Sequence, residues 1–203
     1  MAELTIPKPM SSASMVLHVL AAFIAPHGAT IYRSELLHLM GLLDMNEGTA
    51  GSAATRLAEL GWLMRRRTGR FTHYTITPAA RRAIAAENTL PSPPTSEPDE
   101  AGLTDLTQEL NWFLRRYRAE LTALQSQLRG ESGSPLSPES CFVRLFWLGY
   151  EYRLLVAQGA MQWLGAAWET ENVATLHHTY QSLLDERIGD YVARRVFTVT
   201  AVI

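Results

Sequence analysis

Residues 47–77 read EGTAGSAATRLAELGWLMRRRTGRFTHYTIT. Small and apolar residues recur at helical spacing in the first part of this stretch. Asn46 precedes it as a potential cap, and Gly61 stands where a helix usually ends. After this glycine the pattern alternates with period two, turns at Thr68-Gly69 and returns through residues 71–76. A slim helix followed by a basic hairpin predicts a winged helix, in which the helix enters a DNA major groove and the hairpin meets phosphate.

The flanking segments complete a small N-terminal domain. Residues 11–25 predict a helix, residues 30–32 a short strand, and residues 34–43 a second helix capped by Ser34. Thr77-Pro78 supplies a cap followed by proline at the first helical position, so another helix is expected to begin there. The expected order is helix, strand, helix, helix, strand, strand, helix.

A proline-rich segment separates this domain from the rest of the chain. Residues 88–100, NTLPSPPTSEPDE, hold four prolines and almost no apolar side chains, so they cannot bury surface and are expected to be extended. We therefore predict a mainly α protein with three parts: a winged helix-turn-helix domain over residues 1–88, a linker over 89–102, and an all-helical domain over 103–203.

The C-terminal part is predicted to contain three helices, over residues 103–129, from Ser137-Pro138 to about Ala157, and over 170–196. The first carries one continuous apolar stripe: Leu106, Leu110, Phe113, Leu114, Tyr117, Leu121, Leu124 and Leu128. This stripe and the aromatic segment 142–152 offer more apolar surface than three helices of one chain are expected to cover, which predicts a homodimer joined mainly through residues 103–196. The final residues, 197–203, are β-prone and are left unassigned.

Charge is divided unevenly between the two parts. Residues 1–88 hold nine Lys and Arg against six Asp and Glu, a balance of +3, so the remainder carries −5 of the total of −2. A basic first half beside an acidic second half indicates that only the first meets a polyanion.

Composition and motifs also exclude several classes of protein. The single cysteine, Cys141, cannot form an intramolecular disulfide and is expected in the core beside Phe142. No apolar run reaches the roughly 18 residues of a membrane span, and the start lacks the basic region of a signal peptide, so a cytoplasmic protein without a membrane partner is expected. We find no nucleophile with a base, no phosphate loop and no metal-ligand pattern, His177-His178 included. No enzyme, cofactor or metal is therefore predicted.

The candidate DNA contacts lie on the predicted recognition helix and on the hairpin. They are Ser52, Thr55, Arg56, Arg65, Arg66, Arg67, Arg70 and His73. Arg56 is the best candidate for a base edge, because a guanidinium can donate to O6 and N7 of guanine together. Ala53, Ala54 and Leu57 are expected to be packing residues. The alternative for the arginines is an ordinary solvated charge cluster.

The residues of both halves resemble the PaaX family of phenylacetate-pathway transcriptional repressors. The first half carries the resemblance in residues 53–57 (AATRL), 61–63 (GWL), 69–70 (GR) and 73–77 (HYTIT). The second half carries it in residues 116–117 (RY), 142–145 (FVRL) and 150–153 (YEYR). The resemblance implies a winged-helix repressor and covers about residues 11–88 and 103–196.

Three features depart from the family pattern. Gly51 stands where the family usually has a basic residue of the recognition helix, and Tyr150 replaces a histidine. The ferredoxin-like middle domain of typical members has no counterpart, so the chain resembles a shortened member.

The aromatic residues of the second half have two readings. At helical spacing such residues are most often core, but arginines among them could hold an anionic, partly apolar ligand such as an acyl thioester of coenzyme A. The resemblance implies an effector of that class, or one derived from an aromatic acid. The candidate effector-binding residues are Arg116, Tyr117, Arg144, Tyr150 and Arg153.

Two functions of different classes follow. The first is a dimeric repressor of a catabolic operon that binds a palindromic double-stranded DNA operator and is released by such an effector. The second is a protein-interaction module whose winged helix has lost sequence-specific DNA binding. Gly51 and the modest charge of the first half permit the second.

Overall fold

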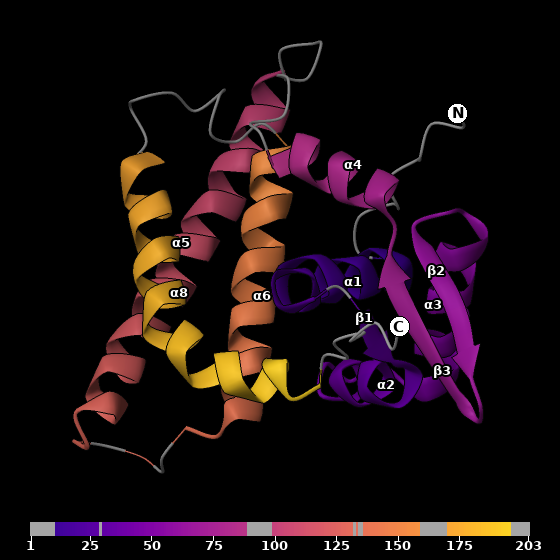
Figure 1. Cartoon of the computed structure of the whole chain (residues 1–203). Helices are drawn as coiled ribbons and strands as arrows, with labels where there is room; N and C mark the ends of the chain where they lie inside the picture. Colours follow the sequence, from indigo (N-terminus) through magenta and orange to yellow (C-terminus); the bar gives the residue numbers. More distant parts are fainter. Residues whose placement is uncertain are drawn as a thin grey trace. The chain divides into compact units, whose positions relative to one another are not determined.

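The computed structural model describes residues 11–28, 30–88, 99–131, 133, 136–158 and 170–195. Its internal contacts divide the chain into two compact units, Met1–Thr89 with Gly189–Ile203, and Leu90–Ile188. The protein is mainly α, with a winged helix-turn-helix arrangement in the first unit and helices in the second (Figure 1). The prediction for residues 89–98 and the unassigned residues 197–203 fall outside the described residues. The last described residues of the chain group with the first unit rather than with the helical part.

The first predicted helix forms, but its second half changes geometry. α1 spans Ser12–Val19, with Ser11 as its cap, and continues as a π-helical turn, Leu20–Ile24, and a 3₁₀ turn, Ala25–His27. Pro26 has no amide hydrogen to donate to an α-helical bond, so the chain leaves the α pattern as it approaches this residue. Val16, Leu20 and Ile24 are fully buried and fix this helix in the core of the unit.

The second helix begins one residue earlier than predicted. β1 spans Thr30–Tyr32 and α2 follows at once over Arg33–Gly41. The predicted cap by Ser34 is wrong: Tyr32 occupies the cap position with extended backbone and makes no side-chain capping bond. Because the strand runs directly into the helix, Arg33 becomes the first helical residue.

The predicted recognition helix is α3, Glu47–Glu59, and both of its predicted ends are confirmed. Asn46 accepts a hydrogen bond from the Thr49 amide at 2.8 Å. At the other end Gly61 adopts a positive φ of 80°, its amide donates to Ala58, and the following amide, of Trp62, donates to Leu57. These two hydrogen bonds form a Schellman motif. The motif requires a residue with left-handed backbone, which glycine adopts without strain.

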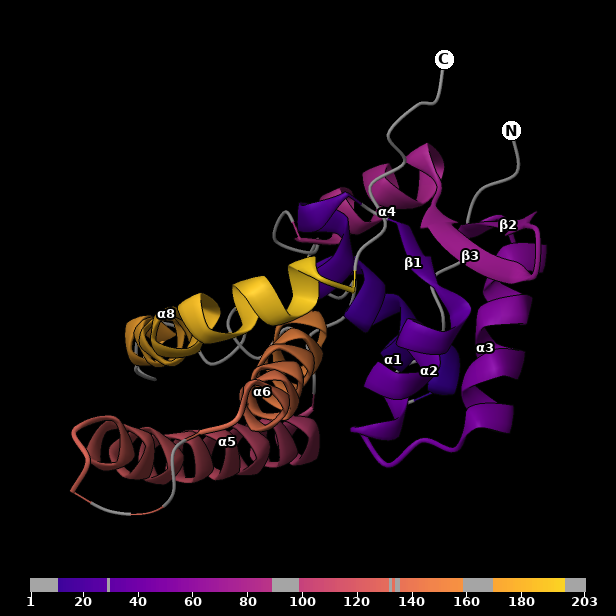
Figure 2. The same ribbon diagram turned by 60° about the horizontal axis from the view of Figure 1, so that its bottom comes forward.

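Three strands form one antiparallel sheet in the order β1-β3-β2. β2, Leu63–Thr68, pairs with β3, Phe71–Ile76, and β3 pairs with β1. Trp62 stands just before β2 rather than within it, and it is buried. Thr77 accepts a bond from the Ala80 amide and caps α4, Pro78–Asn88, as predicted. α3 runs beside the hairpin in both ribbon views (Figure 2) and contacts α1, α2 and β2.

The second unit contains long helices close to the predicted ranges. They are α5, Glu100–Leu128, α6, Pro138–Ala157, and α8, Thr170–Ala193, whose last residues group with the first unit. Ser137 caps α6 by accepting a bond from the Ser140 amide, as predicted. Cys141 is buried in α6 as expected, and this burial raises the pKa of its thiol. None of the helices within the described ranges combines the length and apolar character that a membrane crossing needs.

Candidate nucleic-acid interface

α3 divides cleanly into a buried and an exposed face. Ala50, Ala53, Ala54 and Leu57 are at most 5% exposed, which confirms the packing role expected for the last three. The opposite face carries the small residues Gly48, Gly51, Ser52 and Thr55, together with Arg56 and Glu59. A helix with small side chains outward is narrow enough to enter a major groove about 12 Å wide.

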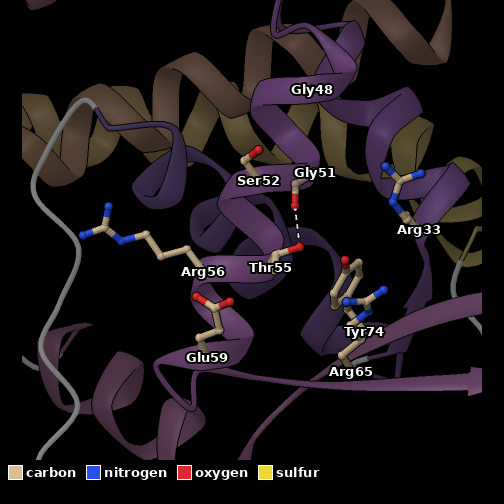
Figure 3. Close-up of a pocket in the computed structure, with 9 residues that line it drawn as sticks. All are labelled: Arg33, Gly48, Gly51, Ser52, Thr55, Arg56, Glu59, Arg65 and Tyr74. Carbon is tan, nitrogen blue, oxygen red and sulfur yellow. Dashed lines mark hydrogen bonds between the residues drawn. The ribbon is translucent and has the colours of Figure 1, made fainter.

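This exposed face forms one wall of an open groove of about 770 Å³ (Figure 3). Three arginines from three different elements line it: Arg33 from the start of α2, Arg56 from α3 and Arg65 from β2. Glu59 is the only acidic residue among the described side chains that line the groove. The groove is therefore electropositive, and phosphate is the chemical group whose charge matches it.

None of the three arginines is paired with an acidic side chain among the residues that the structure describes. Within the described parts of the chain, the guanidinium groups of Arg33, Arg56 and Arg65 make no ion pair or hydrogen bond. The hydroxyl of Thr55 does have a partner, because it donates to the Gly51 carbonyl at 2.9 Å. Ser52 is exposed in the same wall. The structure brings the candidate residues Ser52, Thr55, Arg56 and Arg65 into one groove. It adds Arg33, which the sequence analysis did not single out and which lies 18 positions before Gly51.

The hairpin arginines do not form a single cluster. Strand pairing places Arg65 opposite Tyr74 and Arg66 opposite His73, and because successive strand residues point to opposite faces, Arg65 and Arg66 are on opposite faces of the sheet. Arg67 donates from Nε to the Gly69 carbonyl at 3.0 Å within the hairpin. At the tip, the guanidinium of Arg70 stands 5.0 Å from the centre of the Phe71 ring. All four arginines are exposed.

His73 differs from the other candidate residues of the hairpin. Its side chain is 6% exposed and lies edge-on to the Tyr32 ring, with 6.4 Å between ring centres. It lies on the same face of the sheet as Arg66, away from the groove. A buried imidazole does not reach phosphate, so we leave His73 out of the interface.

In the second unit, Arg116 is held by carboxylates. Its Nε lies 3.1 Å from Glu120 and its Nη1 lies 3.0 Å from Glu151. Tyr117 donates to the second oxygen of Glu151 at 2.7 Å, and Tyr180 donates to Glu120 at 3.0 Å. Burial raises the pKa of Glu151 despite these partners, and burial and the Glu151 contact raise the pKa of Tyr117.

The other candidate effector residues belong largely to helix packing. Tyr150 is buried and stacks on Phe146, with ring centres 5.4 Å apart. Arg144 stands within hydrogen-bonding reach of Tyr180. Arg153 is half-buried on α6. In the described residues, the charge of Arg116 is balanced by two carboxylates, so an anionic ligand would compete with Glu120 and Glu151 for it.

Comparison with known families identifies the first domain. Residues 11–80 match the family model described as PaaX-like protein. Residues 11–80 are therefore similar to the PaaX-like family. No curated protein matches the chain. This similarity indicates a transcriptional regulator. The matched region contains the whole groove, from Arg33 to Tyr74.

Proposed function

We propose that this PaaX-like protein is a transcriptional repressor that binds duplex DNA with the outer face of α3 and with the β2–β3 hairpin. The observation that carries the proposal is the groove, where Arg33, Arg56 and Arg65 face solvent and Glu59 is the one opposing charge among the described lining residues. Duplex DNA supplies what these guanidinium groups lack, namely phosphate oxygens along the backbone and paired acceptors on guanine. Small residues between the arginines let the helix approach base edges closely.

The proposal includes a homodimer. One winged helix reads only a few base pairs, so useful specificity needs two, with half-sites about one helical turn, or a small multiple of it, apart. The helical residues 103–196 are the proposed dimer contact. One chain already buries Leu110, Phe113, Leu114, Tyr117 and Leu124 of the α5 stripe, which leaves less apolar surface than the sequence predicts. Trp112, 49% exposed on α5, is the side chain best placed to contact a second copy.

An effector completes the proposed repressor. The family resemblance supports an acyl thioester of coenzyme A, or a ligand derived from an aromatic acid, as the signal that releases the operator of a catabolic operon. Arg144 and Arg153 on α6, with Tyr150, are the residues proposed to contact its anionic part. Titration of the DNA complex with an aryl-acyl thioester should release DNA, whereas free coenzyme A should not. Equal release by both would remove the acyl group from the proposal.

Fluorescence anisotropy with a duplex from upstream of the protein's own gene tests the DNA contact. Replacing Arg65 and Arg66 by Ala should lower affinity about tenfold per lost phosphate contact at 0.1 M salt, and should reduce the salt slope by about 0.9 per contact. The matched control is Arg81→Ala with Arg82→Ala, which removes the same charge from the exposed side of α4. An equal loss of affinity in both variants would show that binding depends on the net charge of the protein and not on the hairpin. No binding by the natural protein would favour a protein-interaction module.

Sedimentation of the full chain tests the dimer. At tens of micromolar the protein should sediment as two chains rather than at the 22.6 kDa of one. Trp112→Ala should shift the equilibrium toward the monomer, while Thr122→Ala, an exposed change on the same helix, should not. If the protein is a monomer at these concentrations, two copies can associate only when both are bound to DNA.

A further inference from the structure

The strongest unexplained feature of the first unit is a glycine in the middle of α3. Gly51 has ordinary helical backbone, so no turn requires it, and glycine in a helix interior lowers helix stability relative to alanine. The structure supplies a reason. A methyl group placed on Gly51 would lie 3.0 Å from Nη2 of Arg33, closer than such atoms normally approach. The missing side chain leaves room for the guanidinium of another helix.

Arg33 itself occupies an unusual place. It is the first residue of α2, where the helix dipole disfavours a positive charge. The acidic residue nearest to it in sequence, Glu35, is engaged by Arg195, with 3.4 Å between Oε2 and Nε. Within the described ranges, no carboxylate forms an ion pair with Arg33. Its guanidinium instead lies beside α3 (Figure 3), with Nη2 3.0 Å from where a side chain on Gly51 would begin.

We propose that Arg33 contacts a base edge in the DNA major groove, and that Gly51 is the residue that positions it there. The N-terminal part of a recognition helix is the part that meets base edges, and Gly51 is the fifth residue of α3. The guanidinium of Arg33 lies next to Gly51, in the space that a long side chain at position 51 would occupy. α2 therefore contributes a base contact in addition to the phosphate contacts usual for the first helix of such a motif.

This inference rests on the proposed function, and two duplexes separate the two. One is the fragment upstream of the protein's own gene, and the other is a random duplex of equal length. Arg33→Ala should weaken binding to the upstream fragment about 5- to 150-fold, the range for loss of one bidentate base contact, while binding to the random duplex changes much less. Single base-pair substitutions should then show relaxed preference at one position of each half-site.

Arg33→Lys distinguishes a base contact from a phosphate contact. Lysine keeps the positive charge but cannot form the planar pair of hydrogen bonds that guanine accepts from arginine. We expect this variant to lose preference at the same base pair and to retain the salt slope of the natural protein. If lysine restores full affinity, or if Arg33→Ala weakens both duplexes equally, Arg33 is a phosphate ligand and the base contact is overturned.

A double-mutant cycle tests the role of Gly51. Gly51→Ala should raise the urea midpoint, because alanine favours the helix, and at the same time lower affinity for the upstream fragment at least about twofold. In an Arg33→Ala background the same change should no longer affect affinity. Gly41→Ala is the matched control, since it makes the same substitution in α2 with open space around the new methyl group. Unchanged affinity in Gly51→Ala, or effects that simply add, would overturn the positioning role.

Binding that depends on Arg65 and Arg66 but not on Arg33 would refute only the base contact. A natural protein that binds neither duplex would refute both.

Discussion

In the first unit, Arg33, Arg56 and Arg65 surround the exposed face of α3, and no carboxylate of the described residues pairs with them. In the second unit, Arg116 lies between Glu120 and Glu151 and makes an ion pair with each. The same side chain therefore has two different roles. In the groove its hydrogen-bond donors face solvent and are available to a polyanion, whereas in the helical unit they hold α5 against α6.

Ion pairing therefore decides whether an arginine is available to a polyanion. A run of arginines indicates a polyanion only where acidic partners are absent, and the pairing decides this rather than the count. The first half has a balance of +3, which is modest, but of the described side chains that line the groove Glu59 alone opposes the arginines in charge. The second half has nine Lys and Arg as well, yet at Arg116 the surrounding carboxylates balance the charge.

The first expected effect is on stability and follows from Glu151→Ala. The change removes the acceptor of Tyr117 and one partner of Arg116, and it leaves a phenol hydroxyl that is fully buried without its bond. Loss of a partner for a buried polar group costs about 1–3 kcal/mol, so urea unfolding should show a loss in this range. Affinity of the folded protein for DNA should not change.

Glu131→Ala is the matched control for this carboxylate. Glu131 pairs with Arg129 at 2.7 Å, but both side chains are more than half exposed, and such pairs stabilise little. Its urea midpoint should stay at that of the natural protein. Equal destabilisation by the two variants would show that burial of Glu151 is not what gives the Arg116 network its strength.

The second effect is on DNA binding. Arg56→Ala should cost roughly 1–3 kcal/mol of affinity for the upstream duplex and relax preference at one operator position per half-site, because a bidentate base contact contributes about that much. Its stability should change by no more than about 0.5 kcal/mol, since the side chain is exposed. A loss of equal size on every duplex would instead make Arg56 a phosphate ligand.

Local signals were the part of the fold that the sequence predicted well. Asn46, Ser137 and Thr77 cap helices where expected, because a cap bonds to an amide three residues away and needs no knowledge of the rest of the fold. The predicted cap at Ser34 is wrong because the start of α2 depends on a distant residue. The end of β1 at Tyr32 is set by pairing with His73, a distant residue, and that pairing fixes where α2 begins.

Contacts between distant residues were the part that the sequence could not supply. Arg33 and Gly51 are far apart along the chain, and only the packing of α2 against α3 brings them together. A glycine inside a helical pattern was the one signal that could have pointed to Arg33. The Arg116 to Glu151 pair spans 35 positions, so the sequence showed an arginine among aromatics but not the carboxylate beside it.

The smallest effect concerns pH and separates the two units again. His177 stacks on Tyr152 with ring centres 4.2 Å apart, and burial, helped by the neighbouring His178, lowers the pKa of its imidazole below the ordinary value of about 6.5. The unfolded chain therefore binds this proton more readily than the folded chain. The stability that neutral His177 provides is present above pH 6.5 and is lost as the pH falls through the folded pKa.

Urea unfolding at pH 7.5 and 5.5 measures this effect. The change in stability from pH 7.5 to 5.5 should be less favourable for the natural protein than for His177→Phe, which keeps a ring against Tyr152 but cannot take up a proton. Burial raises the pKa of Glu151 and of Asp185, so these carboxyl groups favour the folded state on acidification. Both carboxyl groups are present in the two proteins, so the difference between the proteins reports on His177. An identical pH response in both proteins would assign the effect to another group. In either protein, affinity for a random duplex should be the same at the two pH values wherever the chain is folded, since His177 lies outside the proposed DNA-binding groove.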